Sequence, residues 1–122
     1  MSKKNVGDMA HLFGATRYSL AGLARAWREE QAFRHEVVVL AALAVLLFAT
    51  GKSFGLSLLT LAAWLLVMVA ELLNSAVENA FDLITEERND RVKAGKDMAS
   101  AAIFLAILAN AALWIVVFFV MD

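Results

Sequence analysis

The chain of 122 residues is too apolar for an ordinary soluble domain, with 61% hydrophobic residues and a mean hydropathy of +0.69. A formal net charge of −1 excludes a general attraction to nucleic acid, and the lack of cysteine excludes disulfides and thiolate metal sites. The sequence therefore predicts an all-α integral membrane protein that forms a single domain over residues 1–122.

The segment from about residue 7 to 28 has the pattern of an amphipathic helix. Apolar side chains recur at steps of three and four, as at Leu20, Leu23 and Trp27, and arginines supply a basic part. This pattern favours a helix that lies on the membrane surface. The alternative is a cytosolic helix packed on the loops.

Three longer apolar segments follow and predict three transmembrane helices. We expect them at about residues 29–50, 54–84 and 96–121, because about 20 apolar residues are needed to cross the hydrocarbon. Residues 51–53 have turn chemistry, and the hydrophilic segment 85–95 cannot remain in lipid.

Basic residues near the spans predict the orientation. The first connection holds only Lys52, whereas the other basic residues lie before the first span or between the second and third. The positive-inside rule therefore puts the N-terminus and the 85–95 loop in the cytoplasm and the C-terminus outside.

The second span carries polar residues where an apolar sequence should be uninterrupted. Glu71, Asn74, Glu78 and Asp82 are spaced i, i+3, i+7 and i+11, so they share one narrow side of the helix, here called the polar face. Polar residues can simply join transmembrane helices by hydrogen bonds. Acids without matching bases on the same helix repel one another, however, so we favour a site that binds a cation or handles protons.

The expected topology brings three polar groups to the cytoplasmic side: Glu30 and Arg34, the polar face, and the start of the third span at Lys96, Asp97 and Ser100. Carboxylate and carboxamide oxygens suit Mg²⁺, which usually takes one or two protein carboxylates and phosphate oxygens. A nearby lysine indicates phosphate as the remaining ligand, and a carboxylate at the edge of the hydrocarbon suits a general base. The pattern predicts phosphoryl transfer at the membrane surface.

Other enzyme classes lack their motifs. Gly51-Lys52-Ser53 resembles the end of a phosphate-binding loop, but Leu46 stands where the first glycine should be. His11 and His35 are too isolated to indicate zinc, and no serine has a histidine and an acid at diagnostic positions.

Three separated segments resemble the prokaryotic diacylglycerol kinase family. These are ELLNSAVENAFD at 71–82, AWREEQAFRHE at 26–36 and GKDMASAA at 95–102, and the similarity extends from about residue 18 to 112. The resemblance implies a homotrimeric helical bundle in the bacterial inner membrane. Such an enzyme uses MgATP to phosphorylate the hydroxyl of a membrane lipid, typically diacylglycerol to phosphatidic acid.

The resemblance also implies residue roles. Glu71 is similar to the catalytic base and Glu30 and Glu78 to the metal-binding acids. The supporting residues implied are Asn74, Asp82 and Asp97. Contacts to the nucleotide are implied for His11, Tyr18, Glu30, Glu78, Glu87, Arg88, Asn89, Lys96 and Asp97, and contacts to the lipid for Ala32, Phe33, Arg34, His35, Glu36, Glu71 and Ser100. The chain departs from the family at His11, where arginine is common, at Leu20, where tryptophan is common, and most of all in the 85–95 loop.

Alternative functions stay open on the sequence alone. A polyprenol kinase would use the same machinery on undecaprenol. A small proton-coupled transporter would need a carboxylate near the middle of the bilayer and no ATP, and a structural or assembly protein would leave the polar face unexplained. Because three helices enclose little volume, the site is expected to borrow surfaces from neighbouring subunits.

Overall fold

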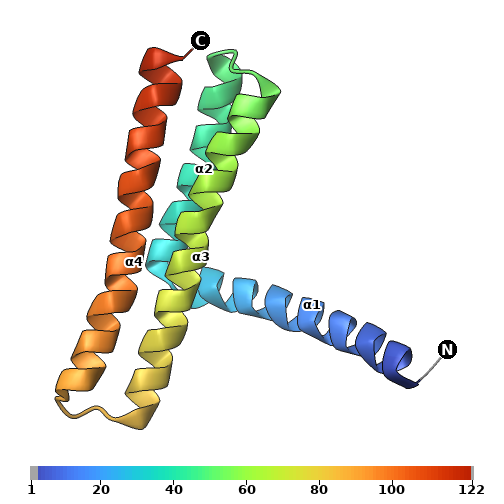
Figure 1. The fold of residues 1–122 in the computed structure, drawn as a ribbon, viewed down its shortest axis with the longest axis vertical. Helices are drawn as coiled ribbons and strands as arrows, with labels where there is room; N and C mark the ends of the chain where they lie inside the picture. The colour runs from blue at the N-terminus through green and yellow to red at the C-terminus, as the bar shows by residue number, and fades with distance from the viewer. Residues whose placement is uncertain (1–2, 122) are drawn as a thin grey trace. The chain divides into compact units, whose positions relative to one another are not determined.

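The computed structural model describes residues 3–121, and this part of the chain is helical with short connections and no strand. The chain divides into two compact units, residues 1–31 and 32–122 (Figure 1). Three helices are long and apolar enough to cross a membrane. The expected all-α membrane class is thereby confirmed.

The first unit is dominated by helix α1, Lys3–Glu29. Its described side chains are largely exposed, and Arg25 Nε donates to Glu29 Oε2 at 2.9 Å. This hydrogen bond and the charge of Glu29 raise the pKa of Arg25, but an exposed pair of this kind stabilises a helix little. The N–H of Glu30 still donates to the carbonyl of Ala26 at 2.8 Å, and the regular helix pauses at Glu30.

The candidate membrane spans are α2, Gln31–Ala49, α3, Phe54–Ile84, and α4, Asp90–Ile115, which continues into a π-helical turn, Val116–Val120. At 1.5 Å per residue, α3 is roughly 46 Å long, more than the hydrocarbon thickness of about 30 Å. A helix of this length extends beyond the hydrocarbon at one end at least.

The turn between α2 and α3 has the chemistry expected from the sequence. Gly51 has a positive φ of 70°, which glycine adopts without steric cost. Ser53 then caps α3, because its hydroxyl accepts a hydrogen bond from the N–H of Leu56 at 3.2 Å.

The connection between α3 and α4 is shorter than the hydrophilic segment 85–95. Asn89 Oδ1 accepts hydrogen bonds from the N–H groups of Arg91 at 2.9 Å and Val92 at 3.2 Å, so α4 begins at Asp90. The helix therefore starts six residues before the expected span at 96, because a side-chain cap rather than hydropathy determines its first turn.

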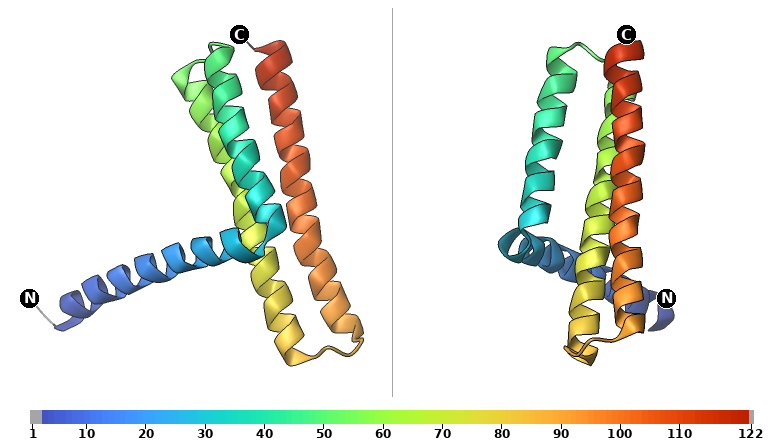
Figure 2. Two further views of the ribbon diagram at one scale, coloured as in Figure 1. Left: turned by 180° about the vertical axis from the view of Figure 1, so that it is seen from behind. Right: turned by 90° about the vertical axis from the view of Figure 1, so that its left-hand side faces the viewer.

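The second unit contains an antiparallel pair, α3 and α4, with α2 beside one half of it. Both views in Figure 2 show α3 and α4 continuing well past the start of α2. The half of α3 that extends past α2 includes Glu78 and Asp82 of the polar face.

Polar contacts join the three helices of the second unit. Trp64 Nε1 on α3 donates to the carbonyl of Glu36 on α2 at 2.8 Å, and the Trp64 ring lies 5.4 Å from that of Trp114 on α4. Asn110 Nδ2 on α4 donates to the carbonyl of Ala63 on α3 at 3.0 Å. These contacts help to fix the heights of α2 and α4 along α3.

Removal of the Trp64 donor should destabilise the bundle. We expect Trp64→Phe to lower the free energy of unfolding in detergent by about 1 kcal/mol, because the Glu36 carbonyl loses its indole partner in a buried setting. The matched control is Trp114→Phe, since Trp114 Nε1 is buried with no hydrogen-bond partner among the described residues. An equal loss in both variants would attribute the effect to ring volume instead of the hydrogen bond.

Candidate functional site

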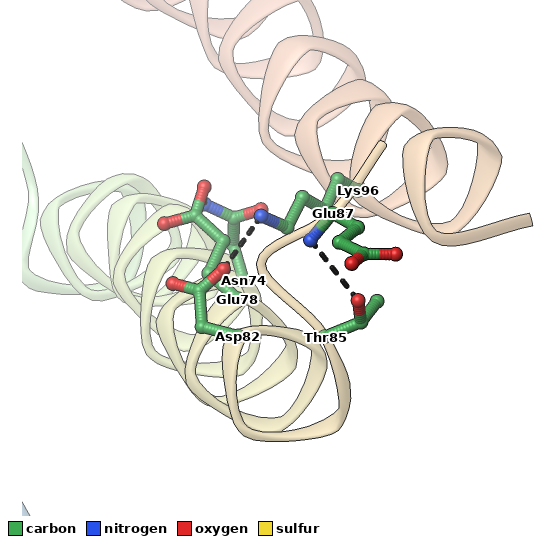
Figure 3. A network of polar contacts seen from close by, with 6 residues as sticks. All are labelled: Asn74, Glu78, Asp82, Thr85, Glu87 and Lys96. Carbon is green, nitrogen blue, oxygen red and sulfur yellow. Dashed lines mark hydrogen bonds and ion pairs between the residues drawn. The ribbon is translucent and has the colours of Figure 1, made fainter. Parts of the chain in front are cut away.

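The part of the polar face from Asn74 to Asp82 is directed towards α4 (Figure 3). Asn74 Nδ2 donates to Glu78 Oε1 at 3.3 Å, one helical turn along. Figure 3 shows Asn74, Glu78 and Asp82 projecting from one side of α3 towards Lys96 on α4. The helical spacing in the sequence is therefore realised as a row of oxygen-bearing side chains.

Lys96 brings a positive charge to this row. Its Nζ lies 2.8 Å from Asp82 Oδ1, and the two side chains are 37% and 60% exposed. Water screens such a pair, so it contributes little to stability. The ion pair instead fixes the position of the Lys96 ammonium group, which lies beside carboxylates where solvent can reach it.

A hollow of about 310 Å³ lies between the ends of α3 and α4. It is lined by Asp82, Thr85, Glu86, Glu87, Arg88, Asn89, Val92, Lys93, Lys96 and Asp97. The expected nucleotide residues of the second unit meet here, apart from Glu78. A cavity with several cations and hydrogen-bonding groups can accept a polyphosphate.

Several groups around the hollow also have structural roles. Asn89 caps α4, and the hydroxyl of Thr85 accepts a hydrogen bond from the N–H of Glu87 at 3.0 Å. Lys93 Nζ pairs with Asp97 Oδ2 at 2.7 Å along α4. Side chains of the α3–α4 connection thus order its backbone. The side chains of Glu87 and Arg88 are exposed to solvent.

The other end of the polar face is buried. Glu71 and Ser75 on α3 are each 8% exposed, and the carboxylates of Glu71 and Glu36 lie close enough for their charges to interact. Glu36 Oε1 is buried and finds no hydrogen-bond partner within the described part of the chain. The polar face therefore runs from an exposed, lysine-paired end at Asp82 to an enclosed end at Glu71.

The remaining expected site residues are distributed over both units. His11, Tyr18 and Glu30 belong to the first unit, so their approach to the polar face stays a prediction. The expected lipid contacts Ala32, Phe33, Arg34 and His35 occupy the first turns of α2, where Phe33 is buried, and Ser100 is exposed on α4.

The donor atoms of the polar face fit Mg²⁺. Asn74 Oδ1 is buried and has no hydrogen-bond partner among residues 3–121, and the Glu78 carboxylate lies one turn away. The described residues hold no group of three or more His, Cys, Asp or Glu side chains able to enclose a metal. Mg²⁺ needs no such enclosure, because it usually completes its octahedral shell with water and substrate phosphates.

Some contacts were missed by the sequence analysis. Trp64, Asn110 and the cap at Asn89 carry hydrogen bonds between or within helices, and Phe81 packs against Gly95. The sequence did carry a signal for two of these contacts. Asn110 is an amide in the middle of an apolar helix, and Asn89 is an asparagine just before a helical pattern. Nothing in the sequence pairs Phe81 with Gly95.

The sequence of the chain is similar to those of known proteins. The family model described as prokaryotic diacylglycerol kinase matches residues 17–118. The diacylglycerol kinase of Haemophilus influenzae is 41% identical over 106 residues, which cover 87% of this chain and 90% of that protein. Those of Pseudomonas aeruginosa and Escherichia coli are 39% and 36% identical, each over 111 residues and 90% of the relative's length, with 91% and 90% of this chain covered. The chain therefore belongs to the prokaryotic diacylglycerol kinase family.

Proposed function

We propose that this protein is an ATP-dependent lipid kinase that phosphorylates the hydroxyl of diacylglycerol to give phosphatidic acid. Family membership supports the kinase chemistry, and the names of the relatives support diacylglycerol as the acceptor. Undecaprenol is the competing acceptor, since the same phosphoryl machinery could act on it.

The observation that carries the proposal is the ion pair between Lys96 and Asp82 at the open end of the polar face. It sets a phosphate-binding cation beside a row of oxygen ligands, and the hollow next to it has room for polar groups of a nucleotide. Phosphoryl transfer depends mainly on positioning and charge neutralisation, which is what such a combination supplies.

In the proposed reaction the nucleotide occupies the hollow and the lipid hydroxyl approaches Glu71. The Glu71 carboxylate accepts the hydroxyl proton while the lipid oxygen bonds to the γ-phosphorus, and the bond from that phosphorus to the β–γ bridging oxygen breaks. The products are the lipid phosphate and ADP. Burial of Glu71 favours this role, because an enclosed carboxylate meets the lipid hydroxyl with little competing water.

Glu30 and Glu78 are the proposed magnesium ligands, with Asn74 and Asp82 supporting them. The ion, when bound with ATP, neutralises phosphate charge during transfer. We expect an excess of EDTA over magnesium to reduce the rate at least a hundredfold, and added Mg²⁺ to restore it. Unchanged transfer in EDTA would remove the metal from the proposal.

We further propose an inner-membrane homotrimer with a cytoplasmic N-terminus and 85–95 segment and an external C-terminus. The distribution of lysine and arginine supports the orientation. The small enclosed volume supports oligomerisation, and the family resemblance supports the number three.

The test is transfer of radiolabelled phosphate from ATP in mixed micelles that contain diacylglycerol, undecaprenol or neither lipid. We expect labelled phosphatidic acid with diacylglycerol and far less product with undecaprenol. The reverse preference would reassign the acceptor. No labelled lipid from a well-folded sample would overturn the kinase proposal.

A further inference from the structure

We propose that Gly95 is a positioning residue for MgATP binding, because it lets the Phe81 ring pack against α4 and so keeps Lys96 beside the polar face. This inference rests on the proposed function for its kinetic consequence. The packing claim itself can be tested without any activity.

The Phe81 ring occupies the space that a side chain at Gly95 would take, so a larger residue there must displace the ring or α4. A Cβ built there would lie 2.5 Å from Cζ and 2.6 Å from Cε2 of Phe81, closer than nonbonded carbons approach. Gly95 lies inside α4, and its φ is not positive, so a turn does not explain the glycine. The close approach of the aromatic ring does.

The neighbouring residues connect this packing to the candidate site. Phe81 directly precedes Asp82 on α3, and Gly95 directly precedes Lys96 on α4. The ion pair of 2.8 Å therefore joins the residues next to the packed pair. A shift of α4 at Gly95 away from the ring would change the separation of Lys96 and Asp82, and with it the position of the ammonium group.

Alanine at position 95 has two opposing effects. It favours the helix by its intrinsic propensity, whereas its methyl group must displace the Phe81 ring. We expect Gly95→Ala to raise KM for MgATP about tenfold, because a misplaced cation binds phosphate poorly, and to change KM for the lipid less than twofold. If Gly95 matters only for helix formation, Gly95→Ala should raise the stability of α4 and leave KM for MgATP unchanged.

The rescue variant combines Gly95→Ala with Phe81→Leu. Leucine keeps the apolar packing nearest the backbone and lacks the Cε and Cζ atoms that the new methyl group would meet. We expect KM for MgATP in the double variant to return to within about twofold of wild type. Gly55→Ala is the matched control, because it adds the same methyl to a helical glycine that has nothing within 4 Å.

A zero-length carbodiimide crosslink provides a readout independent of activity. This reagent joins a lysine amine to a carboxylate in direct contact, and mass spectrometry of the peptides measures the Lys96–Asp82 product. The Lys93–Asp97 pair at 2.7 Å lies within α4 and serves as an internal standard. Gly95→Ala should lower the ratio of the first crosslink to the second several-fold, and the double variant should restore it.

Each outcome decides the proposal. An unchanged KM and crosslink ratio in Gly95→Ala, or a double variant that restores neither, would overturn it. If Gly95→Ala does not fold, the test is the double variant with Phe81→Leu. Wild-type values of KM for MgATP and of the crosslink ratio in that variant support the proposal, and altered values refute it. If wild-type protein phosphorylates no lipid, the proposed function fails, and the crosslink ratios still decide whether Gly95 positions Lys96.

Discussion

Glu71→Gln is expected to lower kcat about a thousandfold, a loss of about 4 kcal/mol of transition-state stabilisation. The amide retains the size of the carboxylate and its place on α3 but cannot accept the hydroxyl proton. Because Glu71 lies at the enclosed end of the polar face, two turns from Glu78, KM for MgATP should change little. Initial rates of labelled phosphatidic acid formation at varied ATP and diacylglycerol measure both parameters.

The control for this substitution is Glu29→Gln, which makes the same chemical change in an exposed acid of α1 that pairs with Arg25. It should keep kcat within about twofold, since an exposed ion pair contributes little. Thermal unfolding in detergent must show that Glu71→Gln is folded. Full activity in a folded Glu71→Gln protein would remove Glu71 from the role of base.

The helices of the membrane domain follow closely from the sequence where hydropathy and capping agree. Helix α3 occupies Phe54–Ile84, the expected range of 54–84, because Ser53 caps its start and a hydrophilic segment follows its end. Helix α4 begins at Asp90 instead of 96, since hydropathy indicates where a helix can enter lipid and not where it begins. Its start is determined by the Asn89 cap, a local hydrogen bond.

The sequence predicts which residues form the candidate site better than it predicts which of them contact one another. Helical spacing predicts that Asn74, Glu78 and Asp82 share a face, and topology predicts that Lys96 lies at the same side of the membrane. Which acid Lys96 contacts depends on the rotation and height of α4 against α3, which are decided by packing such as that of Phe81 on Gly95. Family membership, expected from three motifs, is confirmed by a match over residues 17–118.

At the buried end of the polar face, too, the sequence pattern predicts the residue but not the contact that it makes. The sequence identifies Glu71 as an acid in an apolar helix but does not identify its neighbour. The structure brings Glu36 of α2 next to it and ties the Glu36 backbone to Trp64. Such a contact depends on how two spans align in height, and periodicity within one span carries no information about that alignment.

Lys96→Met is expected to raise KM for MgATP roughly thirtyfold, equivalent to about 2 kcal/mol for a lost hydrogen bond between charged groups. Methionine keeps most of the aliphatic stem and removes the ammonium that contacts Asp82. Lys96→Arg should fall between methionine and wild type, because it keeps the charge but not the compact geometry. Initial rates at varied MgATP provide the measurement, with KM for the lipid as a reference that should stay constant.

Asp82 and Lys52 make this prediction specific. Because Asp82 is proposed to support the magnesium site, Asp82→Asn should raise KM for MgATP, and the rise should shrink at high magnesium. Lys52 lies in the α2–α3 turn, where its Nζ contacts the carbonyl of Met121 at 2.8 Å, and Lys52→Met should not affect ATP use. Equal effects of Lys52→Met and Lys96→Met would indicate a general loss of positive charge, and an unaltered KM in Lys96→Met would exclude Lys96 from phosphate binding. A higher KM for MgATP in Lys96→Met but not in Lys52→Met would show that the Lys96 ammonium binds the nucleotide phosphates between the hollow and the polar face.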